Sequence, residues 1–432
     1  MSQKELEVYG LVIDAKRGYV LAHNIASDPG ITISSIVFGD SVEVPAKLVF
    51  QHPTLRYIIL NYDPSLVVAD IQTPKFSFDK GPVRGEDVFF IGYSEEHLVV
   101  TDKTRVADVH QVKAYQNVEG IIVDLKRSGD CLFGVFLNSE GAISSVLMKP
   151  PIDSVHSRMS VSCVPNYFWS RESENYFALD ISNLADLYDE ITSNEKVESL
   201  RIIDVDFTMI PYILARSMNV PDKWFIRHEE TGGTTSKLLM VDHVSPVINQ
   251  EDLSPLQVGD IVFQIDGKLV DRLRDLEVMY RKKTLNMEVF RDGEMITLEV
   301  PTIDTSKFEN RQFVSWSGAI FQSVPHQVRR NIDELALDVY LTNYVFESPF
   351  SNTELYESYI THVNDIETPD MDLFVEVIKS IGTDTHVKLQ AVRFDNTPST
   401  VTIKTDLHYF QGVEYIKVGD KWEKSPLGKI KP

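Results

Sequence analysis

The chain has 432 residues, 43% of them apolar and 25% charged, which is the composition of an ordinary folded protein and not of a disordered or fibrous one. Its 42 Lys and Arg residues stand against 64 Asp and Glu residues, and the net charge of −22 disfavours sequence-independent binding to nucleic acid or to anionic membranes. We therefore expect neither a nucleic acid nor a membrane among its partners.

Targeting and metal-binding motifs give no positive signal in the sequence. The longest apolar runs are far shorter than the roughly 18 residues that a membrane helix requires. The charged N-terminal residues do not contain the apolar segment of a secretory signal. The two cysteines, Cys131 and Cys163, do not have a metal-ligand spacing. We expect an intracellular protein with no metal and no other cofactor.

Residues 8–150 consist of short segments rich in Val, Ile, Phe and Tyr, which are bounded by turn residues and predict strands. The predicted strands are Val8–Ile13, Tyr19–Leu21, Ile31–Phe38, Ala46–Phe50, Tyr57–Tyr62, Val88–Tyr93, Ile121–Asp124, Gly134–Leu137 and Ile143–Met148. Because the intervals leave no room for crossover helices, the pattern favours an antiparallel barrel or sandwich.

Apolar side chains at helical spacing over residues 181–191 predict an amphipathic helix, which would separate the β-rich start of the chain from a second block. In that block we expect a strand, a helical stretch and a hairpin with a primed turn. These predicted elements are Ile261–Gly267, Leu273–Tyr280 and Met287–Val300. The same order returns near the C-terminus in Tyr359–Asp365, Asp372–Ile378, and the hairpin of Val387–Phe394 with Ser399–Thr405. The sequence therefore predicts two copies of one β-rich module.

Three phrases of the first copy, Gly259-Asp260-Ile261, Asp266-Gly267 and Arg291-Asp292-Gly293, resemble PDZ domains of HtrA (Deg) proteases. The resemblance implies that a module binds an extended peptide by strand addition and holds its terminal carboxylate in backbone N–H groups. The alternative is a PDZ-shaped packing domain that binds no ligand. No clear Gly-Leu-Gly-Phe-like turn precedes the first strand. The candidate peptide-binding residues are Ile202, Ile203, Val205, Leu276, Met279 and Tyr280. The last three would equally form the stripe of a core-facing helix.

Phrases along the whole chain resemble the large fungal nuclear HtrA-like serine proteases. They are Val44-Pro45-Ala46, His52-Pro53, Tyr62-Asp63-Pro64, Val88-x-Phe90-Ile91-Gly92-Tyr93 and His408-Tyr409-Phe410. That family resembles two tandem protease–PDZ–PDZ halves, and this chain looks like the second, degenerate half. The implied fold is mainly β with some α, an incomplete trypsin-like double β-barrel followed by two PDZ domains. The implied segments are a protease-like domain over 1–165, a helical connector over 166–193, and PDZ-like domains over 194–302 and 303–432.

The residues at the implied catalytic positions are wrong in kind for a serine protease. Laid onto the family's motifs, Ile25 stands at the general base, Arg56 at the orienting carboxylate and Leu132 at the nucleophile. Neither aliphatic side chain can accept a proton or attack a carbonyl, and a cation beside the base would repel an imidazolium. His23 and Cys131 lie close to these positions in sequence, but adjacent residues on a strand point apart, which disfavours a Cys–His dyad. We therefore expect no catalytic residue in this chain.

The expected function is that of a non-catalytic half of a nuclear HtrA-like protease, which binds peptide or protein segments for regulation, assembly or protein quality control, with apoptosis and stress roles implied by the resemblance. Expected partners are peptide or protein ligands, further copies of the chain, or an active protease half. The alternative functions are an active serine-type endopeptidase with a displaced or upstream site, and a structural remnant without ligands.

Overall fold

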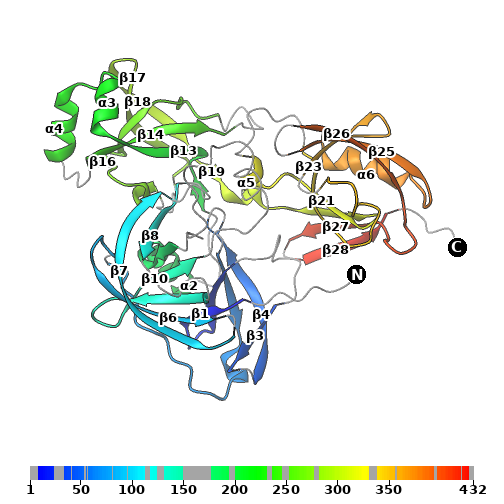
Figure 1. The fold of residues 1–432 in the computed structure, drawn as a ribbon, viewed down its shortest axis with the longest axis horizontal. Coiled ribbons are helices and arrows are strands. Elements are labelled where there is room, and N and C mark those ends of the chain that lie inside the picture. The colour runs from blue at the N-terminus through cyan, green and yellow to red at the C-terminus, as the bar shows by residue number, and fades with distance from the viewer. Residues whose placement is uncertain are drawn as a thin grey trace. The chain divides into compact units, whose positions relative to one another are not determined.

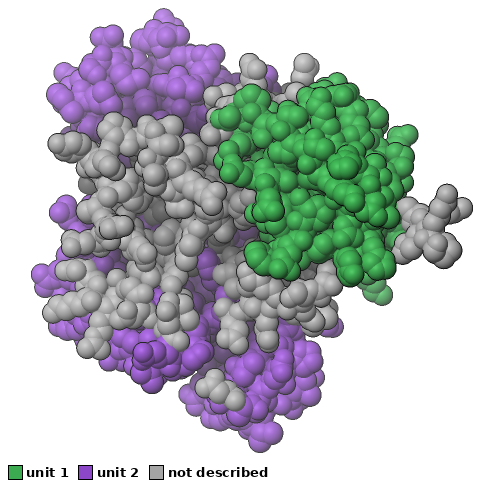
Figure 2. Space-filling model, turned by 45° about the vertical axis from the view of Figure 1, so that its right-hand side comes forward, with its two compact units in different colours: residues 1–5, 153–164, 308–432 green, residues 6–152, 165–307 purple. Residues whose placement is uncertain are grey.

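The computed structural model describes residues 8–23, 34–39, 41–52, 55, 57–79, 81–94, 96–111, 117–123, 131–148, 177–193, 200–230, 236–245, 253–276, 282–329, 338–355, 358–393, 397–419 and 421–427. Contacts divide the chain into two compact units, which Figure 2 colours separately. The larger unit comprises Leu6–Ile152 and Pro165–Lys307. The C-terminal unit comprises Phe308–Pro432 with Met1–Glu5 and Asp153–Val164.

The larger unit begins with an open antiparallel sheet of five strands in the order β1-β2-β5-β4-β3 (Figure 1). Its strands are β1 Gly10–Asp14, β2 Tyr19–His23, β3 Ser34–Phe38, β4 Val42–Gln51 and β5 Tyr57–Tyr62, and the short 3₁₀ helix η2 Pro64–Leu66 follows. A closed barrel comes next, in the order β10-β11-β8-β7-β6-β9. Its strands are β6 Asp87–Ser94, β7 Val99–Gln111, β8 Glu119–Val123, β9 Cys131–Leu137, β10 Ile143–Met148 and β11 Phe177–Asp180. A five-stranded sheet beside a closed barrel agrees with the mainly β, barrel-like fold that the sequence predicts.

A helical segment packs against both of these sheets. The 3₁₀ helix η4 Ile181–Leu184 leads directly into α2 Ala185–Ser193. Its apolar side chains join one core cluster with residues of the open sheet and of the barrel. The members from the helical segment are Ile181, Leu184, Leu187 and Ile191, and those from the strands include Leu21, Ile59, Val146 and Leu179. The predicted helix over 181–191 is therefore present and fills the junction between the two sheets.

The larger unit ends in a third sheet, ordered β13-β14-β15-β17-β18, with β16 paired to β15. Its strands are β13 Val205–Pro211, β14 Lys237–Val244, β15 Ile261–Ile265, β16 Lys268–Leu269, β17 Thr284–Arg291 and β18 Glu294–Pro301. The remaining elements are α3 Tyr212–Ser217, α4 Asp222–Glu230, the 3₁₀ helix η6 Leu273–Leu276, and the pair of β12 Arg201–Ile202 with β19 Ile303–Asp304. Asp292 and Gly293 join β17 to β18 with φ of 49° and 93°, as a primed turn requires.

The C-terminal unit contains a nine-stranded sheet, ordered β26-β25-β23-β22-β21-β20-β27-β28, with β24 paired to β23. Its strands are β20 Gln312–Trp316, β21 Ala319–Gln322, β22 Tyr340–Tyr344, β23 Ser358–Val363, β24 Ile366–Glu367, β25 His386–Arg393, β26 Pro398–Lys404, β27 Val413–Val418 and β28 Lys421–Pro426. The helices are the 3₁₀ helix η7 Thr305–Phe308, which spans the boundary between the units, α5 His326–Arg329 and α6 Met371–Lys379. The part from β21 to β26 has the same strand order as the sheet from β13 to β18.

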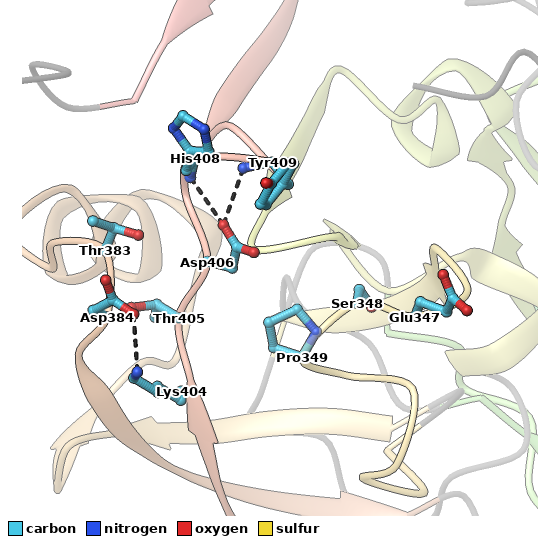
Figure 3. Close-up of a pocket in the computed structure, with 10 residues that line it drawn as sticks. All are labelled: Glu347, Ser348, Pro349, Thr383, Asp384, Lys404, Thr405, Asp406, His408 and Tyr409. Atoms are coloured by element: carbon cyan, nitrogen blue, oxygen red, sulfur yellow. Dashed lines mark hydrogen bonds and ion pairs between the residues drawn. The ribbon is translucent and has the colours of Figure 1, made fainter. Parts of the chain in front are cut away.

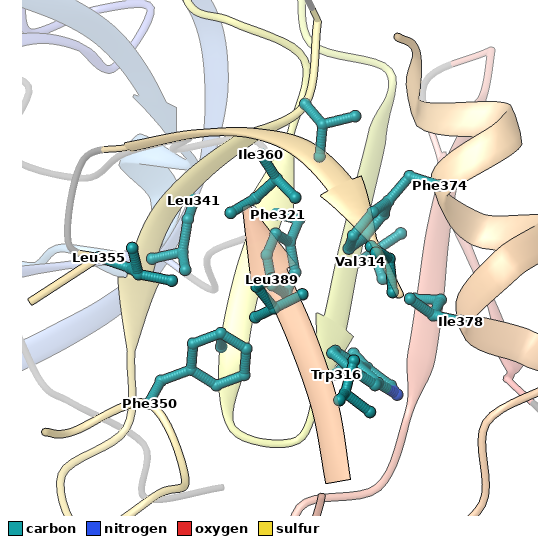
Figure 4. Packing of buried hydrophobic residues seen from close by; sticks show 14 of the residues in the cluster. Val314, Trp316, Phe321, Leu341, Phe350, Leu355, Ile360, Phe374, Ile378 and Leu389 are labelled. Atoms are coloured by element: carbon teal, nitrogen blue, oxygen red, sulfur yellow. The ribbon is translucent and has the colours of Figure 1, made fainter. Parts of the chain in front are cut away.

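Helix α6 covers the core of the C-terminal unit. Asp370 accepts a hydrogen bond from Leu373 N at 2.8 Å and so begins the helix as its N-cap. The apolar side of the helix carries Phe374 and Ile378, which Figure 4 shows directed at the side chains of the strands. The Phe374 ring lies 4.7 Å from that of Phe321 on β21, measured between ring centroids. Packing of this one helix against the sheet therefore stabilises the whole unit.

The structure contains elements that were not predicted, among them the strands β14, β20, β21, β22, β27 and β28. Three further differences concern the barrel and η6. The long strand β7 was not predicted from the sequence. Strand β11 lies inside the range 166–193, which was predicted as a helical connector, and it pairs with β10 and β8 to close the barrel. Of the predicted helix Leu273–Tyr280, the described part is the single turn η6. None of the helices in the described ranges is long and apolar enough to cross a membrane.

Candidate functional site

The three positions implied for catalysis are placed only in part. Ile25 and Arg56 lie outside the described residues, and Leu132 is described by its main chain alone, in β9. Its neighbour Cys131 has no exposed surface and belongs to the apolar core of the closed barrel, so its thiol is closed to a substrate. His23 ends β2, opposite Tyr57 in the open sheet. The prediction that the chain has no catalytic residue stays a prediction.

The chain's described part has no group of three or more His, Cys, Asp or Glu side chains that could hold a metal ion. One histidine of the open sheet is instead held in a structural role. His52 accepts a hydrogen bond from Leu55 N at its Nδ1, over 2.8 Å, and its ring packs against Phe50 and Tyr57. Burial lowers the pKa of His52 to about 3, because the ring loses the water that would solvate its charged form. His52 is therefore a neutral acceptor at physiological pH.

The structure brings three of the six candidate peptide-binding residues into one apolar cluster. Ile203, Val205 and Leu276 are buried at exposed fractions of 5%, 0% and 8% and share that core. Ile202 is half-buried in β12. Met279 and Tyr280 lie outside the described residues. The side chains of the clustered residues therefore belong to the apolar core of the module. Their assignment as binding residues stays a prediction.

A buried ion pair explains why Gly259-Asp260 and Arg291 occur together in the module. Arg291 donates from Nε and Nη2 to the two carboxylate oxygens of Asp260, over 2.7 and 2.6 Å, and its Nη2 also donates to Pro255 O at 2.9 Å. Gln257 N donates to Asp260 Oδ2 at 2.8 Å. Asp260 is 1% exposed. Hydrogen bonding to this carboxylate raises the pKa of Arg291, so the guanidinium stays charged. The pair fixes the loop that enters β15.

Strand β13 lies at an edge of its sheet, since β14 is its one ladder partner among the described strands. Val241 stands opposite Phe207 and exchanges hydrogen bonds with Gly259 and Asp260, on the far side of β14. In an antiparallel ladder, two opposite residues either hydrogen-bond to each other or both direct their N–H and C=O to the outer sides of the pair. Because Val241 bonds to the far side of β14, Phe207 must direct its N–H and C=O away from β14. These are the groups that an added strand would use.

Two side-chain amides from the barrel occupy this edge. Asn117, between β7 and β8, accepts from Phe207 N and donates to Val205 O, both at 2.8 Å. Gln111, at the end of β7, donates from Nε2 to Phe207 O at 2.7 Å. Sequence reasoning missed these contacts, because Gln111 and Phe207 are 96 positions apart and neither residue type marks a motif.

The corresponding edge of the C-terminal unit is filled by main chain. Strand β21 pairs with β22 on one side and with β20 on the other. The β20–β21 hairpin turns through Ser317 and Gly318, whose φ values are 50° and 86°. Strand β20 pairs in turn with β27. In this unit β21 is therefore closed to an added strand on both sides.

The C-terminal unit also contains a hollow of about 640 Å³ (Figure 3). Its lining is polar and comprises Glu347, Ser348, Pro349, Thr383, Asp384, Lys404, Thr405, Asp406, His408 and Tyr409. Asp384 pairs with Lys404 over 2.9 Å, and Asp406 accepts hydrogen bonds from His408 N and Tyr409 N, each at 3.0 Å. These carboxylates hold the walls of the hollow, and we assign it no ligand.

Comparison with known proteins agrees with the motifs. A family model described as a PDZ-like domain matches residues 308–383. The pro-apoptotic serine protease NMA111 of Lodderomyces elongisporus is 34% identical over 98% of this chain, and its counterpart in Meyerozyma guilliermondii is 34% identical over 96%. That of Aspergillus niger is 31% identical over 95%. The chain spans less than half the length of these relatives, 43%, 42% and 40% respectively.

Among solved structures, the HtrA-type protease AlgW with a decapeptide is similar at a TM-score of 0.43 and 14% identity, over 68% of this chain and 81% of that one. A similarity of that size carries no argument about function. The relatives found by sequence are the stronger finding, since each extends over nearly the whole chain. The chain is therefore homologous, across almost all of its own residues, to the fungal pro-apoptotic serine proteases NMA111, as its motifs predict.

Proposed function

We propose that this chain is a non-catalytic, peptide-binding part of an HtrA-type protease, and that it binds an extended protein segment by strand addition along β13. The observation that carries the proposal is the orientation of Phe207, whose N–H and C=O point outward from an edge strand. Main-chain groups on a sheet edge give affinity for any extended peptide, and pockets for alternate side chains give selectivity. The PDZ-like match over 308–383, and the same strand order in the sheet from β13 to β18, support two copies of a PDZ-like module.

The residues at the implied triad support the absence of catalysis. Ile25 and Leu132 offer no group that can take or give a proton, and Arg56 is a cation. Loss of a single triad member lowers catalysis by about four or more orders of magnitude. The proposal includes regulation, assembly or protein quality control as the role, and a nuclear location by resemblance. Its partners would be an active protease half or further copies of the chain. Sedimentation of the purified chain, and imaging of a fluorescently tagged chain in fungal cells, test these two parts.

Strand addition is tested by titrating an apolar decapeptide with a free C-terminal carboxylate into isotope-labelled chain. We expect amide shifts confined to β13 and its neighbours. Met209 lies two residues after Phe207 in β13, so its main-chain N–H also points away from β14. The substitution Met209→Pro removes this donor from the edge and leaves the β13–β14 ladder in place. This variant should bind more weakly. The proposal fails if millimolar peptide shifts no β13 amide, or if it shifts only residues of the C-terminal unit.

A further inference from the structure

We infer that the barrel regulates peptide access to β13, because Gln111 and Asn117 imitate an added strand and an incoming peptide must displace them. The inference rests on the proposed strand addition at β13. Its starting point is the pair of bonds at Asn117: one side-chain amide accepts from Phe207 N and donates to Val205 O. One residue of a parallel neighbouring strand makes the same two bonds, to the C=O of one residue and the N–H of the residue two positions on.

Gln111 continues this imitation along the edge. Its Nε2 donates to Phe207 O, the next acceptor that an added strand would use. An antiparallel peptide would need both the N–H and the C=O of Phe207, and a parallel one would need the groups held by Asn117 and Gln111. In either direction the peptide competes with side chains of the same polypeptide. The contact therefore lowers the apparent affinity for peptide by the fraction of molecules in which the edge is uncovered.

We call the contact of Gln111 and Asn117 with the main chain of β13 the cap. Ion pairs hold the barrel and this module in the position that this contact requires. Arg272, just before η6, binds Glu119 of β8 through Nη2–Oε2 at 2.8 Å and Nε–Oε1 at 3.3 Å. The Glu119 side chain is 13% exposed. Arg274 binds Asp180 of β11 at 3.2 Å and donates to Ser182 Oγ at 3.2 Å. A bidentate, partly buried pair is more specific in geometry than an exposed one. Glu119 lies two residues after Asn117, so this ion pair and the cap move together.

The cap is a reversible device, because each of its parts is individually weak. An uncharged hydrogen bond changes an equilibrium by roughly threefold to tenfold in water. Three such bonds therefore hold the edge closed in most molecules but yield to a peptide that forms a longer ladder. By linkage, a bound peptide must weaken the contact between barrel and module to the same extent. Peptide binding at β13 would thus release Gln111 and Asn117 from the edge of that strand.

The test uses the full chain and the apolar decapeptide, with calorimetry and hydrogen exchange at Phe207 N. The variant Gln111→Ala with Asn117→Ala should bind the peptide about tenfold to hundredfold more tightly than the unaltered chain. Its Phe207 amide should exchange faster without peptide and regain protection with it. The matched control is the double variant Gln72→Ala with Asn138→Ala. Gln72 is exposed, and Asn138 accepts hydrogen bonds from the main chain of a different barrel turn. This control should leave both readouts unchanged.

A charge reversal tests the ion pair separately. Glu119→Arg should raise the affinity for peptide, and adding Arg272→Glu should return it toward that of the unaltered chain. Equal peptide affinity in the unaltered chain and in the Gln111/Asn117 double variant, with both binding at β13, would overturn the inference and leave the proposed function standing. No binding by either protein would overturn the proposed function itself. Slow Phe207 exchange in the double variant would also contradict the inference.

Discussion

Removal of the buried Asp260 carboxylate should destabilise the module from β13 to β18 more than removal of a polar group at the module's surface. Asp260 is 1% exposed and accepts from both Nε and Nη2 of Arg291 and from Gln257 N, at 2.6–2.8 Å. Asp260→Ala leaves a charged, four-fifths-buried guanidinium without its partner. Breaking a buried pair in this way costs about 3–5 kcal/mol. That is a large fraction of the roughly 5–15 kcal/mol by which a domain is stable.

The measurement is urea unfolding, followed by amide exchange in β15 and β17. Asp275 is the matched control, because its carboxylate accepts from two backbone N–H groups of the same module, over 2.9 and 3.0 Å, and pairs with no buried cation among the described residues. Asp275→Ala should cost about 1 kcal/mol, as loss of a cap does. In the double variant Asp260→Leu with Arg291→Met, the cost should fall well below that of Asp260→Ala, because no charge is left unpaired. A loss of under about 1 kcal/mol for Asp260→Ala would refute this reasoning.

Three further changes test other parts of the fold. The pKa of His52 is about 3 in the folded chain against 6.5 unfolded, so its stabilising effect is complete above pH 6.5 and is lost as the pH falls toward 3. Compared with His52→Gln, the unaltered chain should lose about 2 kcal/mol more between pH 7 and 5 in urea titrations, and equal losses would contradict this. Gly318→Ala places a Cβ 2.3 Å from Ser348 Cβ, whereas Gly293→Ala meets nothing within 4 Å at a similar positive φ. Gly293→Ala should cost about 1–2 kcal/mol and Gly318→Ala clearly more, by thermal unfolding, and the reverse order would count against the structure. Phe374→Ala should cost about 3–5 kcal/mol in denaturant, while the exposed Glu376→Ala on the same helix should cost under about 0.5, and similar values would contradict the packing of α6.

Of two neighbouring barrel strands, β6 could be predicted from its apolar alternation and β7 could not. In β6, buried and exposed residues alternate without exception, with Val88 and Phe90 facing the core. Strand β7 turns Thr104 as well as Val106 inward, so its apolar alternation is broken and the sequence reads as a polar loop. The turn between β17 and β18 could also be predicted, because an Asp-Gly pair is typical of a primed turn, and both residues have positive φ.

The candidate site could be predicted only in its local part. Ile203 and Val205 could be named from the sequence as residues near the first strand of the module, and the structure places Val205 at the start of the edge strand β13. The cap on that strand depends on Gln111 and Asn117, ordinary polar residues from a distant barrel turn. Their role depends on the contact between the barrel and β13, and no periodicity or motif in a single sequence indicates which residues form such a contact. The same limit hid the pair of Arg272 with Glu119, residues 153 positions apart.

The absence of catalysis is tested most directly by incubating the purified chain with casein and measuring peptide-bond hydrolysis. Because Ile25, Arg56 and Leu132 occupy the implied triad positions, we expect no turnover above that of a heat-unfolded sample and no labelling by a fluorophosphonate probe. Turnover that is abolished by His23→Ala or Cys131→Ala would contradict the account.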